Sequence, residues 1–330
     1  PVTDQSAKLM KDGGWNVVWC CNEQELDVAH KYDMKGILYD EKLNPDVMND
    51  PVKVAQAVEL INKVKNHPAL DSYFVADEPG TYRFPNIIKM VDLIKKNDPV
   101  HLPYINLYPT YCSNEGLGTK GDIIPAYQEY LDRFISEVKP QLLSYDNYQF
   151  FTDGDGAHYF LNLELMRKAS LQHNIPFMNV IQACSWAPNV RVPTGNELRY
   201  LTYTSIAYGA QGLSHYCYWR YAPEYKGMIV DDNGKPTHLY HTAKYVNHEY
   251  TAITKELMQT KSMGAYHMGM VPMGTVGLPQ NAPFKIVASD NNAHQTKQWQ
   301  ITKPVEGFLL GYFGKAGSKK PSHVVVVNLD

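Results

Sequence analysis

The sequence predicts an α/β fold: a (β/α)8 barrel of parallel strands with a β-rich C-terminal appendage. Short, almost continuous apolar runs alternate with longer segments whose apolar residues recur at three- and four-residue spacing. This is the pattern of parallel strands whose two faces are covered. The alternation recurs about eight times, which suits a barrel of roughly 250 residues. No GxGxxG motif follows any apolar run, which argues against an open, doubly wound sheet.

The elements are expected in regular order along residues 1–261. The first helix has Thr3 as its N-cap and a glycine stop, and no strand precedes it. The first barrel strand is therefore expected upstream of Pro1 or absent, and the visible strands are numbered two to eight. The strands are expected at residues 15–21, 35–40, 70–76, 102–107, 142–148, 177–183 and 213–219. The helices are expected at residues 3–13, 23–32, 51–66, 84–96, 123–138, 160–173, 195–209 and 239–258.

The pattern changes after about residue 262. Apolar runs at residues 271–287, 308–313 and 324–329 are divided by turns rich in Gly, Pro and Asn, and no helical spacing occurs. We therefore expect a catalytic barrel over residues 1–261 and a β-sandwich-like domain over 262–330. The last run reaches Asp330, so this second domain is expected to be incomplete.

Composition narrows the class of protein. The chain of 330 residues has a formal net charge of -3, so no basic field attracts nucleic acid or an anionic membrane. No stretch approaches the roughly 20 apolar residues of a membrane span. The five cysteines form no CxxC pair and are expected to be free, buried thiols. Because the chain opens at Pro1 without Met, we expect a processed form with its signal peptide removed, located in the extracellular space or the periplasm.

The strand ends of a barrel carry its active site, and here they are rich in carboxylates, amides and aromatic rings. They show no Cys/His metal set, no Gly-rich phosphate cradle and no GxSxG motif, so no metal and no cofactor are expected. Carboxylates beside aromatic platforms are what glycoside hydrolysis needs, because one acid protonates the leaving oxygen and a second attacks or activates water. The expected substrate contacts are Asp40, Asp77, Tyr108, Asn147, Gln182, Trp186, His215 and Trp219. For the two tryptophans the competing interpretation is rim packing, and for His215 it is a satisfied barrel histidine.

The run YFVADEPG, residues 73–80, ends the fourth strand at Glu78. With this motif the chain resembles the clan of (β/α)8 glycoside hydrolases related to family 42 β-galactosidases and cellulase-like enzymes. The resemblance covers most of residues 1–260 as architecture, and its motif is three residues long. In that clan the acid/base Glu ends strand four, typically after Asn and often before Pro. The resemblance therefore implies that Glu78 is the general acid or acid/base, although Asp77 stands where the clan has Asn.

The clan places a nucleophilic Glu at the end of strand seven, where this sequence has Gln182. Three explanations stay open. Asp146, at the end of strand six, serves as the second carboxylate and leaves room for a water, which would suit inversion. Alternatively, Glu224 or Asp40 reaches the site from a neighbouring loop. In the third, the barrel binds sugar without cleaving it.

The leading hypothesis is a glycoside hydrolase that acts on a poly- or oligosaccharide, with Glu78 and Asp146 as its catalytic carboxylates. The alternative is a catalytically inactive carbohydrate-binding barrel. A lyase or isomerase that abstracts a proton with a carboxylate and a His is a third hypothesis. The strand ends supply no convincing trio of metal-binding carboxylates for it.

Overall fold

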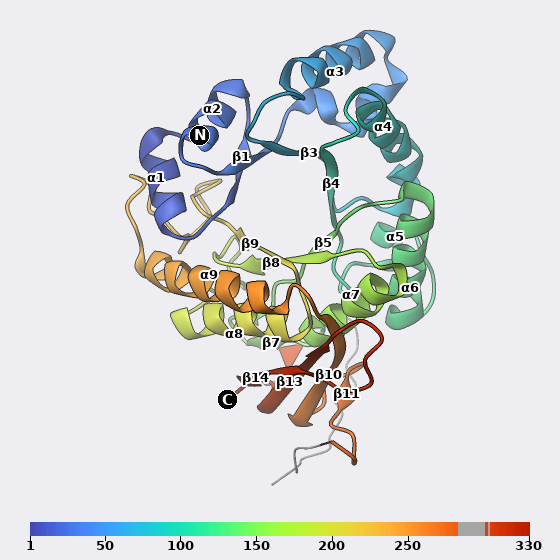
Figure 1. Cartoon of the computed structure of the whole chain (residues 1–330), viewed down its shortest axis with the longest axis vertical. Coiled ribbons are helices and arrows are strands. Elements are labelled where there is room, and N and C mark those ends of the chain that lie inside the picture. Colours follow the sequence, from blue (N-terminus) through green and yellow to red (C-terminus); the bar gives the residue numbers. More distant parts are fainter. Residues whose placement is uncertain (283–300, 303) are drawn as a thin grey trace. The chain divides into compact units, whose positions relative to one another are not determined.

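The computed structural model describes residues 1–282, 301–302 and 304–330 (Figure 1). Its internal contacts divide the chain into two compact units. The first comprises Pro1–Tyr108 and Cys112–Ser144, and the second comprises Pro109–Tyr111 and Tyr145–Asp330. All seven predicted barrel strands are present and alternate with the predicted helices. The described residues thus hold a partial (β/α)8 barrel, because a closed one needs eight strands.

The first unit contains four parallel strands that pair in chain order. Cys20 pairs with Leu38, Leu38 with Tyr73, and Asp77 with Asn106. Parallel pairing in this register brings the carboxyl ends of the strands to one edge of the sheet. The strands are β1 (Val17–Cys20), β2 (Lys35–Leu38), β3 (Leu70–Asp77) and β4 (Leu102–Leu107).

Helices cover one face of this sheet (Figure 1). In α3 (Pro51–Val64), Asp50 accepts the Val52 N–H at 2.9 Å as the N-cap, and the buried face recurs at Ala57, Ile61 and Val64. The other helices of the unit are α1 (Asp4–Asp12), α2 (Glu23–Lys31), α4 (Phe84–Asn97), α5 (Asn114–Leu117) and α6 (Ile123–Arg133), with the short turns η1 (Glu41–Leu43), η2 (Pro45–Asn49), η3 (Thr81–Arg83) and η4 (Phe134–Val138).

The second unit continues the same alternation after β5 (Leu143–Asp146), which carries the chain from one unit into the next. Strands β8 (Phe177–Gln182) and β9 (Gly212–Tyr216) are parallel, with Gln182 opposite Tyr216. The helices are α7 (Tyr159–His173), α8 (Gly195–Ala207) and α9 (His238–Leu257). A small antiparallel sheet is formed by β6 (Phe150–Phe151), β7 (Gly154–Gly156) and β12 (Ile301–Thr302).

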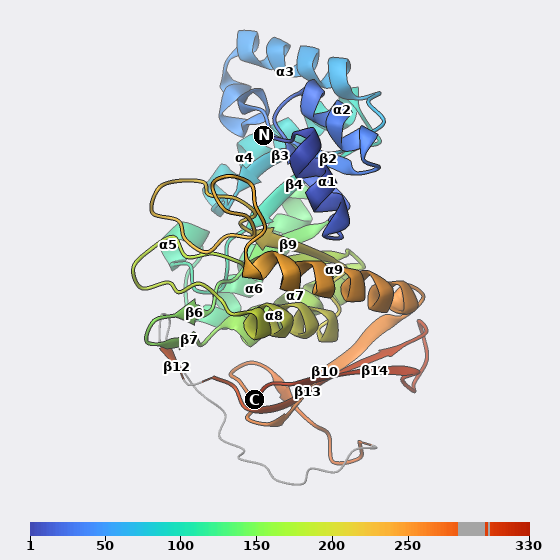
Figure 2. The ribbon, with the colours of Figure 1, turned by 90° about the vertical axis from the view of Figure 1, so that its left-hand side faces the viewer.

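The first nine residues of helix α7 are buried on every side. Its residues 159–167 are all buried, including Glu164, whose carboxylate receives two hydrogen bonds of 2.8 Å from Arg167. This burial arises because α7 contacts both β8 and the C-terminal sheet (Figure 2). The paired charges satisfy each other inside an apolar setting, where a single charge would be costly.

The C-terminal sheet has the order β11-β10-β13-β14. It contacts α8 so closely that a Cβ on Gly311 would lie 2.3 Å from the Ala207 carbonyl oxygen. The predicted strands at 308–313 and 324–329 are confirmed. Its strands are β10 (Lys261–Gly269), β11 (Val276–Gly277), β13 (Gly307–Gly314) and β14 (His323–Asn328).

The predicted strand at 271–287 is wrong over its described part, apart from β11. Residues 283–287 lie outside the described residues. The sequence prediction also missed β10, because its run KSMGAYHMG mixes glycine and polar residues directly after a helix. The domain boundary predicted at residue 261 stays a prediction.

Candidate active site

The predicted site residues belong to both units. Glu78, Asp77, Asp40 and Tyr108 lie in the first unit. The second unit holds Asp146, Asn147, Gln182, Trp186, His215 and Trp219. Glu78 and Asp146 therefore belong to different units, and their pairing stays a prediction.

Glu78 stands directly after β3, in an unusual backbone conformation. Its φ is 43°, in the left-handed region that non-glycine residues seldom adopt. Its N–H donates a 2.8 Å hydrogen bond to the Asn106 carbonyl oxygen at the end of β4. Strained backbone of this kind persists only where the surroundings hold it, and it concentrates at functional sites. The neighbouring strand therefore fixes where the Glu78 side chain begins.

The loop after Glu78 is held by a second set of contacts. The buried Tyr130 hydroxyl donates to the Pro79 carbonyl oxygen at 2.8 Å. The Thr81 hydroxyl donates to the Gly118 carbonyl oxygen at 3.0 Å. A Cβ on Gly80 would lie 2.3 Å from the carbonyl oxygen of Gly116, so only glycine fits. The turn that carries Glu78 is thus rigid on both sides.

Asp77 takes part in a polar network at the same edge of the sheet. Asn106 Nδ2 donates to Asp77 Oδ1 at 3.1 Å, and the Ser144 hydroxyl donates to Asn106 Oδ1 at 2.9 Å. The side chain of Asp77 keeps contact with solvent, yet the protein packed around it raises the pKa of this carboxyl group. The hydrogen bond from Asn106 lowers that pKa by a smaller amount. In this network the Asn106 amide is the donor and the Asp77 carboxylate is the acceptor.

Tyr108 lies within electrostatic reach of the carboxylates. Burial, with smaller contributions from Cys112, Glu78 and Asp77, raises the pKa of Tyr108 to about 12. The phenol therefore stays protonated at physiological pH and remains a hydrogen-bond donor. Asp40 has a local role as the N-cap of η1, because its Oδ1 accepts the Lys42 N–H at 2.9 Å.

An aromatic cluster on the first unit was missed by the sequence analysis. The Trp19 and Phe74 ring centroids lie 4.9 Å apart, and Phe74 also contacts Tyr39 and Tyr104. Trp19 is 40% exposed and Tyr39 44%. The signal in the sequence was the alternation in β1, where buried Val18 and Cys20 flank Trp19 and place its ring on the opposite face of the sheet.

Gln182 ends β8 with its amide fully engaged. Its Oε1 accepts the Phe150 N–H at 3.0 Å. Its Nε2 donates to the carbonyl oxygens of Arg191 at 2.9 Å and Phe150 at 3.2 Å. The side chain is completely buried. Gln182 therefore holds β6 to the segment at Arg191, and it can contact a substrate only if these hydrogen bonds break.

A second aromatic cluster lies on the second unit. The rings of Tyr148 and Tyr216 are stacked at 5.4 Å, and Trp186 packs edge-on against both, at 4.7 and 5.7 Å. The Tyr216 hydroxyl forms a 2.6 Å hydrogen bond with the Tyr225 hydroxyl. Trp219 is outside this cluster and contacts Tyr218. These half-exposed rings come from the end of β9 and from the segments that follow β5 and β8.

Of the other polar candidates of the second unit, Asn147 and Asp146 are buried and His215 is half-buried. Asn147 donates to Asn162 Oδ1 at 3.0 Å, and the same oxygen accepts the Thr110 N–H. Asp146 is 4% exposed. Both imidazole nitrogens of His215 are buried from solvent, and burial lowers the pKa of His215 to about 4. His215 is thus neutral at physiological pH.

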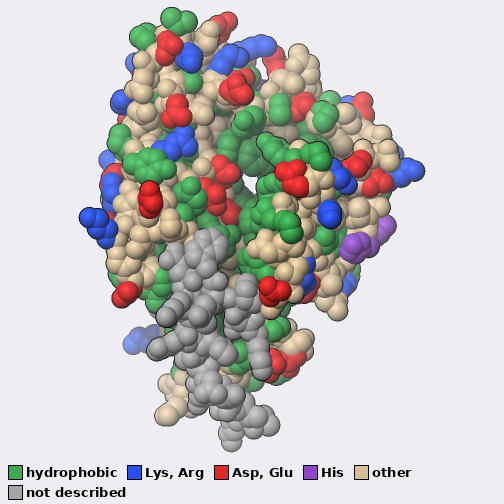
Figure 3. Space-filling view, turned by 180° about the vertical axis from the view of Figure 1, so that it is seen from behind, with side chains coloured by type: hydrophobic (Ala, Val, Ile, Leu, Met, Phe, Trp, Pro, Cys, Tyr) green, Lys and Arg blue, Asp and Glu red, His purple; other side chains and the backbone are tan. Residues whose placement is uncertain are grey.

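Over residues 1–282, 301–302 and 304–330, no group of three or more His, Cys, Asp and Glu side chains could hold a metal ion. In the same part of the chain, no helix is both long and apolar enough to cross a membrane. Acidic and basic side chains are interspersed on the face shown in Figure 3. All five cysteines are free, and Cys20 and Cys184 are buried as predicted, whereas Cys21 is exposed.

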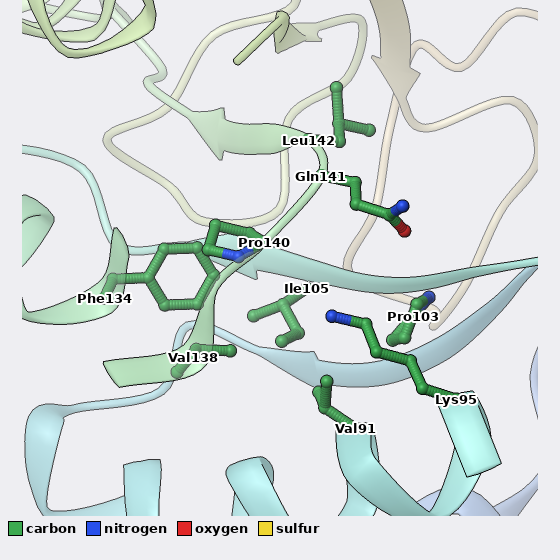
Figure 4. Close-up of a pocket in the computed structure, with 9 residues that line it drawn as sticks. All are labelled: Val91, Lys95, Pro103, Ile105, Phe134, Val138, Pro140, Gln141 and Leu142. Atoms are coloured by element: carbon green, nitrogen blue, oxygen red, sulfur yellow. The ribbon is translucent and has the colours of Figure 1, made fainter. Parts of the chain in front are cut away.

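A small cavity lies in the first unit, between β4, α4 and η4 (Figure 4). Its volume is about 10 Å³, which is room for about one water molecule. It lies on the helix-covered side of β4 and cannot hold a sugar ring. Its lining residues are Val91, Lys95, Pro103, Ile105, Phe134, Val138, Pro140, Gln141 and Leu142.

Comparison with known proteins supports the fold. No family model and no curated protein matches the sequence. Solved structures do match. A β-galactosidase from Bacillus circulans sp. alkalophilus matches with a TM-score of 0.60 and 12% identity, over 82% of this chain and 56% of that one. A β-galactosidase from the psychrophilic Marinomonas ef1 matches with a TM-score of 0.56 and 11% identity, over 77% of this chain and 58% of that one.

A third match is the GH2 β-galacturonidase from Eisenbergiella tayi, with a TM-score of 0.52 and 17% identity, over 76% of this chain and 48% of that one. This chain therefore spans about half the length of these structures. At such identities the likeness concerns the fold alone. The described residues share the fold of these glycoside hydrolases as a partial (β/α)8 barrel.

Proposed function

We propose that this chain is a glycoside hydrolase in which Glu78 is the general acid. The observation that carries the proposal is the fixed turn at the end of β3. At this turn the backbone of Glu78 is strained, and its N–H is hydrogen-bonded to the Asn106 carbonyl oxygen. The loop that follows is held by the hydrogen bond from the Tyr130 hydroxyl to the Pro79 carbonyl oxygen. A general acid must be placed accurately beside the glycosidic oxygen, and a rigid strand end provides such placement. The shared fold with glycosidases supports the same conclusion.

The surroundings of Glu78 suit a sugar. Asp77 can accept hydrogen bonds from hydroxyl groups, and the protonated Tyr108 can donate one. The exposed rings of Trp19 and Tyr39 offer apolar faces for stacking in the first unit. We assign the second carboxylate to Asp146, a buried acid at the end of β5.

The test is a hydrolysis screen of the full chain against aryl glycosides and a panel of poly- and oligosaccharides, read by released reducing sugar. The Glu78→Gln variant keeps the shape of the side chain and removes the acid, so activity should fall by about 10²–10⁴-fold. Glu59→Gln, at an exposed position on α3, is the matched control and should retain full activity. Activity that persists in Glu78→Gln would remove Glu78 from the mechanism.

A second candidate function is carbohydrate binding without cleavage. It is favoured by Gln182, whose amide is fixed by backbone groups of Phe150 and Arg191 where the resemblance implies a nucleophilic Glu. Calorimetric binding of glycans with no product from any of them would favour this candidate. Hydrolysis that depends on Glu78 would exclude it.

The proposal also covers the clan of glycoside hydrolases, the class of substrate and the cellular location of the protein. The DEP motif at residues 77–79 supports membership of the clan related to family 42 β-galactosidases. The resemblance to that clan suggests a plant- or algal-type polysaccharide, or its oligosaccharides, as substrate. Because polysaccharides do not cross membranes unaided, we place the protein in the extracellular space or the periplasm. Detection of the native protein in culture medium or a periplasmic extract tests the location.

A further inference from the structure

Two cysteines meet where β8 and β9 end. The strands pair as far as Gln182 and Tyr216, and Ala183 continues the pairing by donating its N–H to the Tyr216 carbonyl oxygen. Just beyond this point the Sγ atoms of Cys184 and Cys217 lie 3.6 Å apart. Both cysteines belong to the second unit, so this contact lies within one compact body.

The two thiols have different exposure. Cys184 is completely buried, whereas Cys217 is partly exposed. In its thiol form Cys217 donates to the Trp219 carbonyl oxygen at 3.1 Å. A reagent from solvent therefore reaches Cys217 first, and Cys184 lies behind it in contact distance. This is the arrangement of an attacking thiol and a resolving thiol.

The pKa shifts of the thiols point to the same order of reaction, in which Cys217 attacks first and Cys184 follows. The hydrogen bond from Cys184 lowers the pKa of Cys217, and this hydrogen bond together with burial raises the pKa of Cys184. Burial raises the pKa of Cys20 to about 12 and that of Cys112 to about 11. The pKa of the exposed Cys21 is also raised. Cys217 thus carries the most readily formed thiolate among the five cysteines, all of which the structure describes.

We propose that Cys184 and Cys217 form a redox-active dithiol that closes reversibly to a disulfide by exchange with a low-molecular-weight disulfide, RSSR. The Cys217 thiolate attacks one sulfur of RSSR, forms a mixed disulfide and releases one RS⁻. The Cys184 thiolate then attacks the Cys217 sulfur and expels the second RS⁻, which takes up a proton. The protein loses two protons and two electrons, and RSSR takes them up and is reduced to two RSH.

Formation of the disulfide changes the contacts just beyond the ends of β8 and β9. The sulfurs must approach each other by about 1.6 Å to reach bonding distance. Once oxidised, Cys217 has no S–H to donate, so its hydrogen bond to the Trp219 carbonyl oxygen is lost. Trp219 and Trp186 each lie two residues from a cysteine of the pair. The state of the dithiol therefore decides whether Cys217 holds the backbone of Trp219 by this hydrogen bond, whether or not the chain cleaves sugars.

The test treats the reduced, full chain with oxidised glutathione at neutral pH and then maps its thiols by mass spectrometry. We expect an intact mass lower by two hydrogen atoms and a linked pair of peptides that contain Cys184 and Cys217. Cys184→Ser should trap one glutathione on Cys217, because the resolving thiol is gone. Cys112→Ser is the matched control and should close as the wild-type chain does.

Two results would overturn the inference. One is that Cys184 and Cys217 both remain open to alkylation in denaturant after the treatment. The other is a mixed disulfide on Cys217 that persists in the wild-type chain. Because the wild-type measurement needs no variant and no activity, the inference is tested even if Cys184→Ser folds poorly or the chain hydrolyses no glycoside.

Discussion

Replacing Gln182 by glutamate tests the hydrogen bonds of this side chain at the end of β8. Gln182 Nε2 donates to the carbonyl oxygens of Arg191 and Phe150, at 2.9 and 3.2 Å, inside a completely buried setting. A carboxylate cannot donate, so Gln182→Glu turns two favourable contacts into repulsive ones. The Phe150 carbonyl oxygen keeps the Arg191 N–H at 3.1 Å, whereas the Arg191 carbonyl oxygen loses its donor. An unsatisfied acceptor costs about 1–3 kcal/mol, and the repulsion of a buried carboxylate adds to this loss. We therefore expect a loss of about 2–5 kcal/mol in the free energy of unfolding at pH 7.

The loss should depend on pH. Burial against carbonyl oxygens raises the pKa of the new carboxyl group above its unfolded value of about 4.3. The folded state therefore loses stability as pH rises through this range, and the variant should be closer to wild type at pH 4 than at pH 7.

The assay is urea-induced unfolding followed by circular dichroism at both pH values. Gln128→Glu, at an exposed position on α6, is the control and should stay within about 0.5 kcal/mol of wild type. If the free energy of unfolding of Gln182→Glu matched that of the control at pH 7, the proposed role of Gln182 in holding Phe150 and Arg191 would be wrong. Position 182 could then carry a catalytic glutamate without loss of stability.

Three further changes test the packing and the electrostatics. Burial raises the pKa of Asp155 to about 6, so the folded state loses stability as pH rises from about 4 to 6 and the carboxyl group ionises. Asp155→Asn should therefore be up to about 3 kcal/mol more stable than wild type at pH 7, as measured by urea unfolding. This gain should disappear near pH 4. Tyr73→Phe removes the buried 2.7 Å hydrogen bond to Asp98 and should cost about 1–2 kcal/mol by the same measurement. Gly311→Ala places a Cβ against Ala207 and should lower the free energy of unfolding by about 1–3 kcal/mol, and an unchanged melting temperature would contradict this packing.

The local patterns in the sequence predicted most of the fold. Continuous apolar runs marked all seven barrel strands, because parallel strands are buried on both faces. The position of Glu78 followed from the end of the run YFVAD. Strand β10 was missed because its glycines and polar residues contradict strand propensity, and packing against α7 outweighs that propensity.

The roles of individual side chains were harder to predict, because their partners are distant in sequence. Gln182 was expected to bind substrate, but its main partner, Phe150, lies 32 residues away and became visible only in the structure. Cys184 and Cys217, 33 residues apart, were expected to be separate buried thiols. Trp19 was predicted to lie in a strand. The exposure of its ring could not be predicted, because it depends on which face of the sheet the helices cover.

The most direct test of the account compares two substrates that share one sugar and differ in leaving group. A general acid protonates the departing oxygen, so a dinitrophenyl glycoside, whose leaving group needs no proton, makes little use of it. We predict that Glu78→Gln lowers kcat/KM by about 10²–10⁴-fold on the unactivated glycoside and by far less on the dinitrophenyl glycoside. Equal losses on both substrates, or no loss on either, would contradict the assignment of Glu78 as the general acid.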